Sequence, residues 1–179
     1  MKKILTLFTV LLLLTGCNKL DNTPTKQVES FFNKYQTLDK EVLNDLDSAT
    51  ALEINFNTEQ RDKYKSIMKR HYQNLSYEIK DSKENADKAT VTVEIEVTDY
   101  SKTLSATNIY LNANRDEFLD EQGNYDNTKF NDYRLNELSK TKDKVKYTLD
   151  LTLTKKDDKW VLDDIDEEIE DKIHGVYVY

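Results

Sequence analysis

The sequence of 179 residues is short of the residue types that build many common functional sites. It contains one cysteine, one proline, two histidines and three glycines. A single cysteine excludes a disulfide framework and a cysteine-rich zinc site. Neither a P-loop nor a G-x-G-x-x-G motif occurs, and both depend on closely spaced glycines. One proline and few glycines also argue against a long disordered body.

The sequence also lacks an apolar run long enough to cross a bilayer. The longest such run is Ile4–Leu14, eleven residues interrupted only by Thr6 and Thr9, whereas a spanning helix takes about 20 residues. Lys2 and Lys3 precede the run, and small residues follow it. A basic head, a short apolar core and a small-residue end are typical of a secretory signal peptide.

The cysteine follows that run in the stretch "LTGC", Leu14 to Cys17. These residues resemble the lipobox of bacterial lipoproteins. The resemblance implies cleavage between Gly16 and Cys17, and transfer of a diacylglycerol, with acyl chains such as palmitate, to the Cys17 thiol. The alternative is a buried free cysteine, which would need an apolar run without helical or strand period to pack in a core. Two or more acyl chains give stable attachment to a bilayer.

The chain is acidic, with a net charge of −8. Loss of Lys2 and Lys3 with residues 1–16 would leave a chain of 163 residues with a net charge of −10. We expect such a chain to be repelled by nucleic acid, which proteins bind through lysine and arginine. The lipid, and not a basic patch, would then hold it at the membrane. We expect a tether at 17–23 and one domain at 24–179.

Apolar residues at helical spacing dominate the first part of that domain. Val28, Phe31, Phe32 and Tyr35 recur at steps of three and four, and Thr23 before Pro24 is a typical helix start. The pattern predicts helices at about 24–37, 39–48 and 58–73.

The period then changes to two. Residues 75–79 alternate, "DSKENADK" reads as a turn, and "ATVTVEIEVTDY" (89–100) has valine and isoleucine on one face only. Such alternation is typical of an antiparallel sheet with one buried face. Residues 145–165 predict a hairpin with a loop of four or five residues at "KKDDK".

Two further helical regions are expected. Residues 104–139 predict a helical insertion broken at Gly123-Asn124, and 165–174 predict an amphipathic helix ended by Gly175. The closing "VYVY" is interpreted as an edge strand.

The order of elements predicts an α+β fold. The stretches "PTKQVESFFNKYQTLD", "YKSIMKRHYQNLSYEIKDS", "KATVTVEIEVTDY" and "LTLTKKDDKWVLDDI" resemble small bacterial lipoproteins with an NTF2-like or cystatin-like domain. The resemblance implies N-terminal helices packed in the hollow of a curved antiparallel sheet. It implies a fold and no particular activity.

Few residues suggest catalysis or metal binding. His71 and His174 belong to separate predicted elements, without an H-E-x-x-H motif, so no zinc site is expected. His71 is interpreted as a packed residue or as part of a pocket. The acidic run 163–171 fits a solvated helix face better than a calcium loop, because isoleucines interrupt it at helical spacing. We expect no cofactor and no catalytic residue.

Eleven tyrosines, six phenylalanines and one tryptophan are numerous for this length. Tyrosine suits a ligand pocket because its ring is apolar and its tip polar. The residues expected to line a pocket are Tyr64, His71, Tyr77, Tyr147 and Trp160.

These patterns predict a lipid-anchored, extracytoplasmic, non-enzymatic domain that binds a small ligand or a protein partner at the membrane surface. Two other classes stay open. One is a structural or accessory protein of the cell envelope, and the other is an NTF2-like enzyme.

Overall fold

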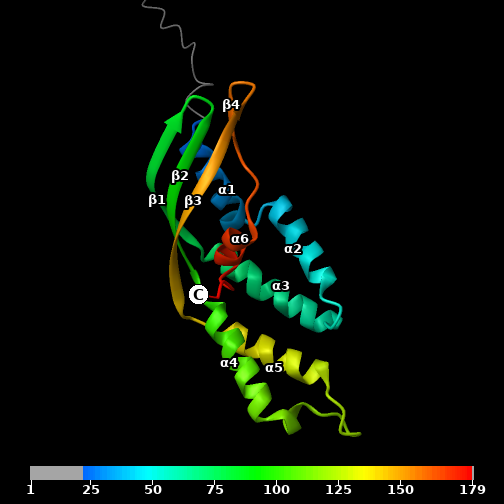
Figure 1. Ribbon diagram of the computed structural model, residues 1–179. Helices are drawn as coiled ribbons and strands as arrows, with labels where there is room; N and C mark the ends of the chain where they lie inside the picture. The colour runs from blue at the N-terminus through cyan, green and yellow to red at the C-terminus, as the bar shows by residue number, and fades with distance from the viewer. Residues whose placement is uncertain (1–21, 179) are drawn as a thin grey trace, which may run out of the picture.

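The computed structural model describes residues 22–178 (Figure 1). The predicted signal peptide and Cys17 lie outside the described residues. The elements in chain order are α1 (Pro24–Thr37), α2 (Lys40–Leu52), α3 (Thr58–Gln73), β1 (Ser76–Asn85), β2 (Lys88–Thr98), α4 (Tyr100–Ala113), a short 3-10 helix η1 (Arg115–Phe118), α5 (Asn127–Lys140), β3 (Lys144–Lys156), β4 (Lys159–Leu162) and α6 (Glu167–His174). The predicted α+β class is confirmed.

The strands form one antiparallel sheet in the order β1-β2-β3-β4. β2 pairs along its whole length with β3, from Lys88 opposite Thr154 to Thr98 opposite Lys144. The predicted alternation in β2 is confirmed, since its valines and isoleucine are fully buried. The opposite face is polar, and Glu94 there forms an ion pair of 3.1 Å with Lys146 of β3.

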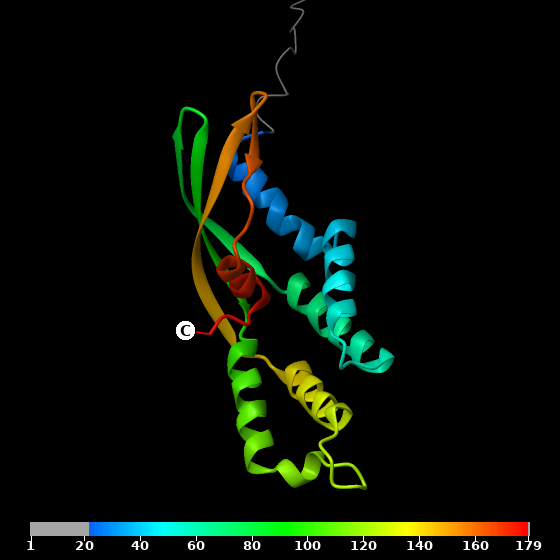
Figure 2. The same ribbon diagram turned by 45° about the vertical axis from the view of Figure 1, so that its right-hand side comes forward.

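Helices α1 and α6 cover the apolar face of the sheet (Figure 2). Val28 and Phe32 of α1 and Ile173 of α6 are buried against the strand residues. Removing a side chain of this kind from water stabilises a fold by roughly 1.5–3 kcal/mol. The predicted packing of an N-terminal helix on the sheet is therefore confirmed, and side chains fill the space between the layers.

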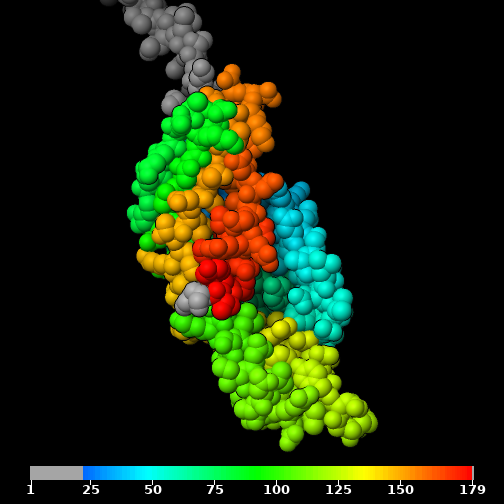
Figure 3. All heavy atoms as spheres, in the orientation of Figure 1, coloured from blue at the N-terminus to red at the C-terminus, as the bar shows by residue number. Residues whose placement is uncertain are grey.

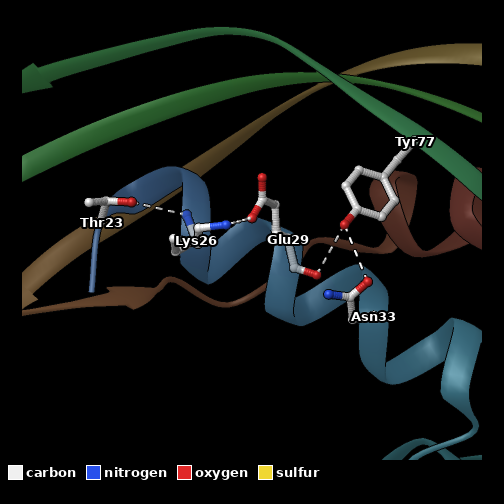
Figure 4. A network of polar contacts seen from close by, with 5 residues as sticks. All are labelled: Thr23, Lys26, Glu29, Asn33 and Tyr77. Carbon is white, nitrogen blue, oxygen red and sulfur yellow. Dashed lines mark hydrogen bonds and ion pairs between the residues drawn. The ribbon is translucent and has the colours of Figure 1, made fainter. Parts of the chain in front are cut away.

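Contacts from β1 and β4 hold α1 in place. Thr23 caps the helix by accepting a hydrogen bond from Lys26 N at 3.2 Å, and the Tyr77 hydroxyl of β1 donates to Asn33 Oδ1 at 3.3 Å (Figure 4). Asn22, just before the helix, donates to Trp160 O and accepts from Trp160 N. The point where the chain enters the domain is thus held against the edge strand.

A second apolar cluster holds the helices to one another. It is formed by Val42, Leu46, Phe56, Ile67, Met68, Tyr72, Tyr100, Leu135 and Leu138. These residues come from α2, α3, α4, α5 and the loop before α3. The buried Gln60 adds polar contacts, because it donates to Thr128 O at 3.0 Å and to Asp132 Oδ1 at 2.7 Å.

The insertion between β2 and β3 is a helical arm made of α4, η1 and α5. It extends from the end of the sheet opposite the start of α1 (Figures 1 and 2), and it forms the narrow lower end of the molecule in Figure 3. The helices pack through stacked Tyr110 and Tyr133, whose ring centroids lie 4.8 Å apart. The arm begins at Tyr100, four residues before the predicted boundary.

Several predicted boundaries were wrong. Most of "DSKENADK" continues β1, and the turn lies at Ala86-Asp87. The β3–β4 loop has two residues, Asp157 and Asp158, both with positive φ, which is the backbone of a tight hairpin turn. α2 extends to Leu52.

The described part of the closing "VYVY" is no strand. The backbone N–H groups of Val176 and Tyr177 bond to Asp171 O instead. The same carbonyl also accepts from the N–H of Gly175. The bonds close the C-terminal turn of α6, so the two N–H groups are not available to pair with a strand.

The end of α6 joins the sheet, α3 and the arm. Gly175 has φ +70°, and a Cβ there would lie 2.0 Å from Thr98 O. Its carbonyl accepts from Tyr100 N at 2.8 Å and from Ser101 N at 3.1 Å, which satisfies the free N–H groups at the start of α4. The buried His71 donates from Nε2 to Ile173 O at 2.8 Å.

Gly175→Ala is expected to destabilise the protein by at least about 3 kcal/mol, because the positive φ and the contact with Thr98 O both oppose a side chain. Gly123→Ala is the matched control, since Gly123 also has a positive φ but no atom within 4 Å of an added Cβ. The control should lose only about 1 kcal/mol. Urea denaturation measures both values, and equal losses would contradict the role given to the contact.

His71 makes stability depend on pH. Burial lowers its pKa to about 4, and the hydrogen bond to Ile173 O only partly opposes this shift. The unfolded chain, with a histidine pKa near 6.5, binds more protons between these values, so stability is complete above about pH 6.5 and falls toward pH 4. The expected loss from pH 7 to 4.5 is about 2 kcal/mol.

His71→Gln keeps a donor for Ile173 O and cannot be protonated. The free energy of unfolding of this variant should therefore fall less between pH 7 and 4.5 than that of the wild type. His174, whose pKa burial also lowers, stays in the variant and leaves a smaller dependence in the same direction. Identical pH dependence in both proteins would refute the assignment.

Candidate functional site

Two concavities lined by tyrosine meet at Tyr64 and Met68 of α3. The first, here called the tyrosine pocket, has a volume of about 250 Å³ and lies among α1, α2, α3 and α6. Its lining residues are Tyr35, Val42, Asp45, Leu46, Ala49, Tyr64, Met68, Tyr72, Glu170 and His174.

The second concavity, here called the arm pocket, has a volume of about 200 Å³. It lies where α3 meets the arm, and it is lined by Glu53, Phe56, Tyr64, Ile67, Met68, Tyr100, Leu104, Arg134, Leu135, Leu138 and Val176. Arg134 contacts the faces of Phe56 and Phe130, with 5.6 and 5.8 Å from Cζ to the ring centroids. These contacts occupy its guanidinium group and leave the arm pocket mainly apolar.

The position of each ring in the tyrosine pocket follows from the helix that carries it. Tyr35 continues the apolar stripe of Phe31 and Phe32, with which α1 contacts the sheet, and it packs against both the sheet cluster and the helical cluster. There its ring contacts Tyr72 with centroids 5.1 Å apart at 76°. Tyr72 in turn contacts His174 of α6, with centroids 5.8 Å apart.

Burial and negative charge act together on these groups. The pKa of Tyr35 is raised to about 12, first by burial and then by the charges of Glu170 and Asp45. Burial also raises the pKa of Tyr72 above its ordinary value, and the neighbouring Tyr35 and Tyr64 add to this shift. Burial lowers the pKa of His174. At neutral pH the tyrosines are therefore protonated and the histidine is neutral, so the charges of the pocket are those of its carboxylates.

A larger concavity of about 510 Å³ gathers basic side chains where α3 and α5 end. Most of these cations have partners there. Arg70 donates to Ser139 O at 2.7 Å, Lys144 Nζ lies 3.4 Å from Asn74 O, and Lys140 pairs with Glu137 at 2.6 Å. Cations at helix C-termini are stabilised by the carbonyls that those ends leave free, which accounts for this basic surface without a ligand.

The five residues expected to line one pocket lie in different places. Tyr64 lines both tyrosine-bearing concavities. His71, on the same helix, is buried at the Gly175 junction. Tyr77 is half-buried against α1, with its ring stacked on Phe32 at 5.1 Å.

The other two lie on β3 and β4. Tyr147 contacts the ring of Tyr177, with centroids 5.9 Å apart. Trp160 is buried beneath the chain entry, and its ring contacts Lys155. Tyr77, Tyr147 and Trp160 are therefore distributed along the sheet. The aromatic residues that come together between the helices are Tyr35, Tyr64 and Tyr72.

Reasoning from the sequence missed Tyr35, Asp45, Glu170 and His174 as pocket residues. Tyr35 was interpreted as part of the buried stripe of its helix, and Glu170 as part of a solvated acidic face. These residues share a pocket because helices far apart in the chain contact one another. The helical period of each segment alone does not predict such contacts.

The acidic run 163–171 covers the residues that lead into α6 and the first part of that helix. Asp166 caps that helix by accepting from Ile169 N at 2.8 Å, and Ile169 and Ile173 pack toward the sheet. Within residues 22–178, no three histidine, cysteine or acidic side chains come together in a way that could hold a metal ion. None of the helices in that range combines the length and apolar character needed to cross a membrane.

Comparison with known proteins identifies a lipid attachment site in the N-terminal segment. Residues 1–18 match the model of the prokaryotic membrane lipoprotein lipid attachment site, and Cys17 lies inside that match. No curated protein matches the chain.

One solved structure is similar to this chain. It comes from Bacillus subtilis subsp. subtilis strain 168 and is described as a "putative lipoprotein (ycdA)", with 17% sequence identity and a TM-score of 0.43. The likeness covers 83% of this chain and 46% of that one, so this chain matches less than half of that protein's length. Because residues 1–18 match a lipoprotein lipid attachment site, the chain is a bacterial lipoprotein anchored to a membrane by lipid.

Proposed function

We propose that this lipoprotein is an extracytoplasmic, non-enzymatic binding domain that holds a small ligand at the membrane surface. The observation that carries the proposal is the pair of tyrosine-lined concavities that share Tyr64 and Met68. Small-ligand sites are mostly apolar hollows between elements, with a few polar groups to orient the ligand. A protein partner is the other ligand class that the sequence suggests, and such a partner would insert a side chain into the same hollows.

The chemistry of the tyrosine pocket favours binding over catalysis. General acid–base catalysis needs a donor and an acceptor within hydrogen-bond reach and with pKa values near the working pH. The tyrosines have raised pKa values and His174 a lowered one. Among the described residues, no hydrogen bond joins two side chains that line this pocket. These features suit a rigid recognition surface.

The short link to the lipid supports a role close to the membrane. Five residue steps separate Cys17 from Asn22, a reach of at most roughly 18 Å, and Asn22 is bonded to Trp160 on the edge strand. With Cys17 as the lipidated residue, the hairpin ends lie next to the bilayer and the arm points away from it. Such confinement raises the effective concentration of ligands and partners at the same surface.

A second candidate is a structural or accessory protein of the cell envelope. The observation in its favour is the exposure of Leu52 (80%) and Ile54 (85%) in the segment between α2 and α3. Two neighbouring apolar side chains form a small surface compared with the patches of several hundred Å² typical of protein contacts. The binding proposal therefore takes precedence.

Cys17→Ala is expected to abolish lipid attachment. Metabolic labelling with radioactive palmitate should mark the wild type and leave the variant unmarked, and the variant should stay uncleaved or leave the membrane fraction. The layers outside the cytoplasmic membrane are first made permeable, and that membrane is left intact. Protease added from outside should then degrade the wild type. A labelled, processed and membrane-bound variant, or a wild type protected from the protease, would refute the anchor or its orientation.

Filling a pocket is expected to remove ligand binding. Ligand-observed NMR of the full chain with a library of small metabolites should find compounds whose binding Ala49→Trp or Leu104→Trp weakens by about tenfold or more. Ala51→Trp on α2 and Ile109→Trp on α4 are matched controls, because their side chains are exposed and line neither pocket. If no compound responds to either filling variant, the binding proposal fails.

A further inference from the structure

We propose that the tyrosine pocket binds a small organic cation, with an alkylated ammonium group as its recognised part. This inference rests on the proposed function and names the chemical class of ligand for one of the two concavities. Three features of the pocket support it: the arrangement of its rings, the state of its two carboxylates, and the absence of lysine and arginine from the described residues that line it.

The rings provide walls at a steep angle to each other. The planes of Tyr35 and Tyr72 meet at 76° with centroids 5.1 Å apart, and Tyr64 lines the same hollow about two helical turns before Tyr72 on α3. The faces of tyrosine rings carry negative electrostatic potential and attract cations within about 6 Å. Rings set at a steep angle can contact one rounded ammonium group from two sides, as in aromatic cages for methylated amines.

The two carboxylates of the pocket differ from their neighbours on the same helices. Asp47 on α2 pairs with Lys65 at 2.8 Å, and Glu168 on α6 pairs with Lys172 at 2.5 Å. Asp45 and Glu170, which line the pocket, take part in none of the ion pairs between described residues. Burial is the main cause of the raised pKa of Tyr35, and the negative charges of Glu170 and Asp45 add to it, as expected of carboxylates close to that ring.

Other ligand classes fit this lining less well. An anion would meet two carboxylates and no cationic side chain. A bare metal cation such as calcium needs six or more oxygen ligands, and most of the lining is carbon. An alkylated ammonium carries its charge on methyl groups and is weakly hydrated, so aromatic faces replace its water at low cost. The volume of about 250 Å³ limits the ligand to a small molecule or to one group of a larger one.

Choline is the probe that tests this inference, with 3,3-dimethylbutan-1-ol as its neutral isostere. Isothermal titration of the full lipidated chain, in a non-ionic detergent, should give saturable choline binding below about 10 mM. The neutral isostere should bind about tenfold more weakly or not at all. The inference fails if choline up to that concentration produces no binding heat, or if the isostere binds equally well.

Variants then assign the binding to the pocket. Tyr35→Leu, and the pair Asp45→Asn with Glu170→Gln, should each weaken choline binding by about tenfold or more. Tyr35→Phe should bind nearly as well as the wild type, because the ring face remains, and it also shows that the site tolerates a change at Tyr35. Asp47→Asn with Glu168→Gln is the matched control and should leave affinity unchanged. Equal losses in the control pair would overturn the assignment.

The failure of this inference is distinct from the failure of the proposed function. Compounds that lose binding in Ala49→Trp without any preference for positive charge would refute the cation and leave a binding pocket in place. The absence of any compound sensitive to Ala49→Trp or Leu104→Trp would refute both.

Discussion

The contact of Gly175 with the end of β2 is the constraint on which the arrangement of the other elements depends. At this point the chain leaves α6 with a positive φ, approaches Thr98 O closely, and offers its own carbonyl to the first N–H groups of α4. His71 of α3 donates to Ile173 O, two residues before Gly175. One short segment therefore joins the sheet, the arm and α3, and only a residue without Cβ fits there.

That junction also places the wall of the tyrosine pocket. Glu170 and His174 belong to α6, whose C-terminal end is held against the sheet and α3, and they complete a hollow that α1, α2 and α3 begin. The apolar face of the sheet is covered by side chains such as Val28 and Phe32 of α1. Both tyrosine-lined concavities therefore lie among the helices, and the sheet is the layer on which α1 and α6 pack.

The two ends of the molecule have different surroundings in a lipid-anchored protein. Asn22 is bonded to β4 close to the hairpin turns, and the arm lies at the other end (Figure 1). The arm packs through its own aromatic pairs, such as Tyr110 with Tyr133, and α4 starts from the carbonyl of Gly175. The arm is thus a helical projection at the end of the domain opposite Asn22.

The sequence by itself determined the lipid attachment site, the α+β class, the face of each main strand and the position of the principal helices. These features follow from local patterns: a basic head with a lipobox, a period of two in β2, and apolar steps of three and four in α1 and α3. Turn positions were less predictable, because Asp157 and Asp158 adopt a left-handed backbone that the residues "KKDDK" permit without requiring it.

Only the tertiary structure decided which aromatic and acidic residues share a pocket. Tyr64 was predicted and lines it, whereas His71, Tyr77, Tyr147 and Trp160 are held at other contacts. Tyr35, Asp45 and Glu170 come together because the second apolar cluster and the Gly175 junction bring α1, α2 and α6 around α3. Helical spacing predicts which face of a helix is apolar. The element that packs against that face is determined by contacts between segments distant in the chain.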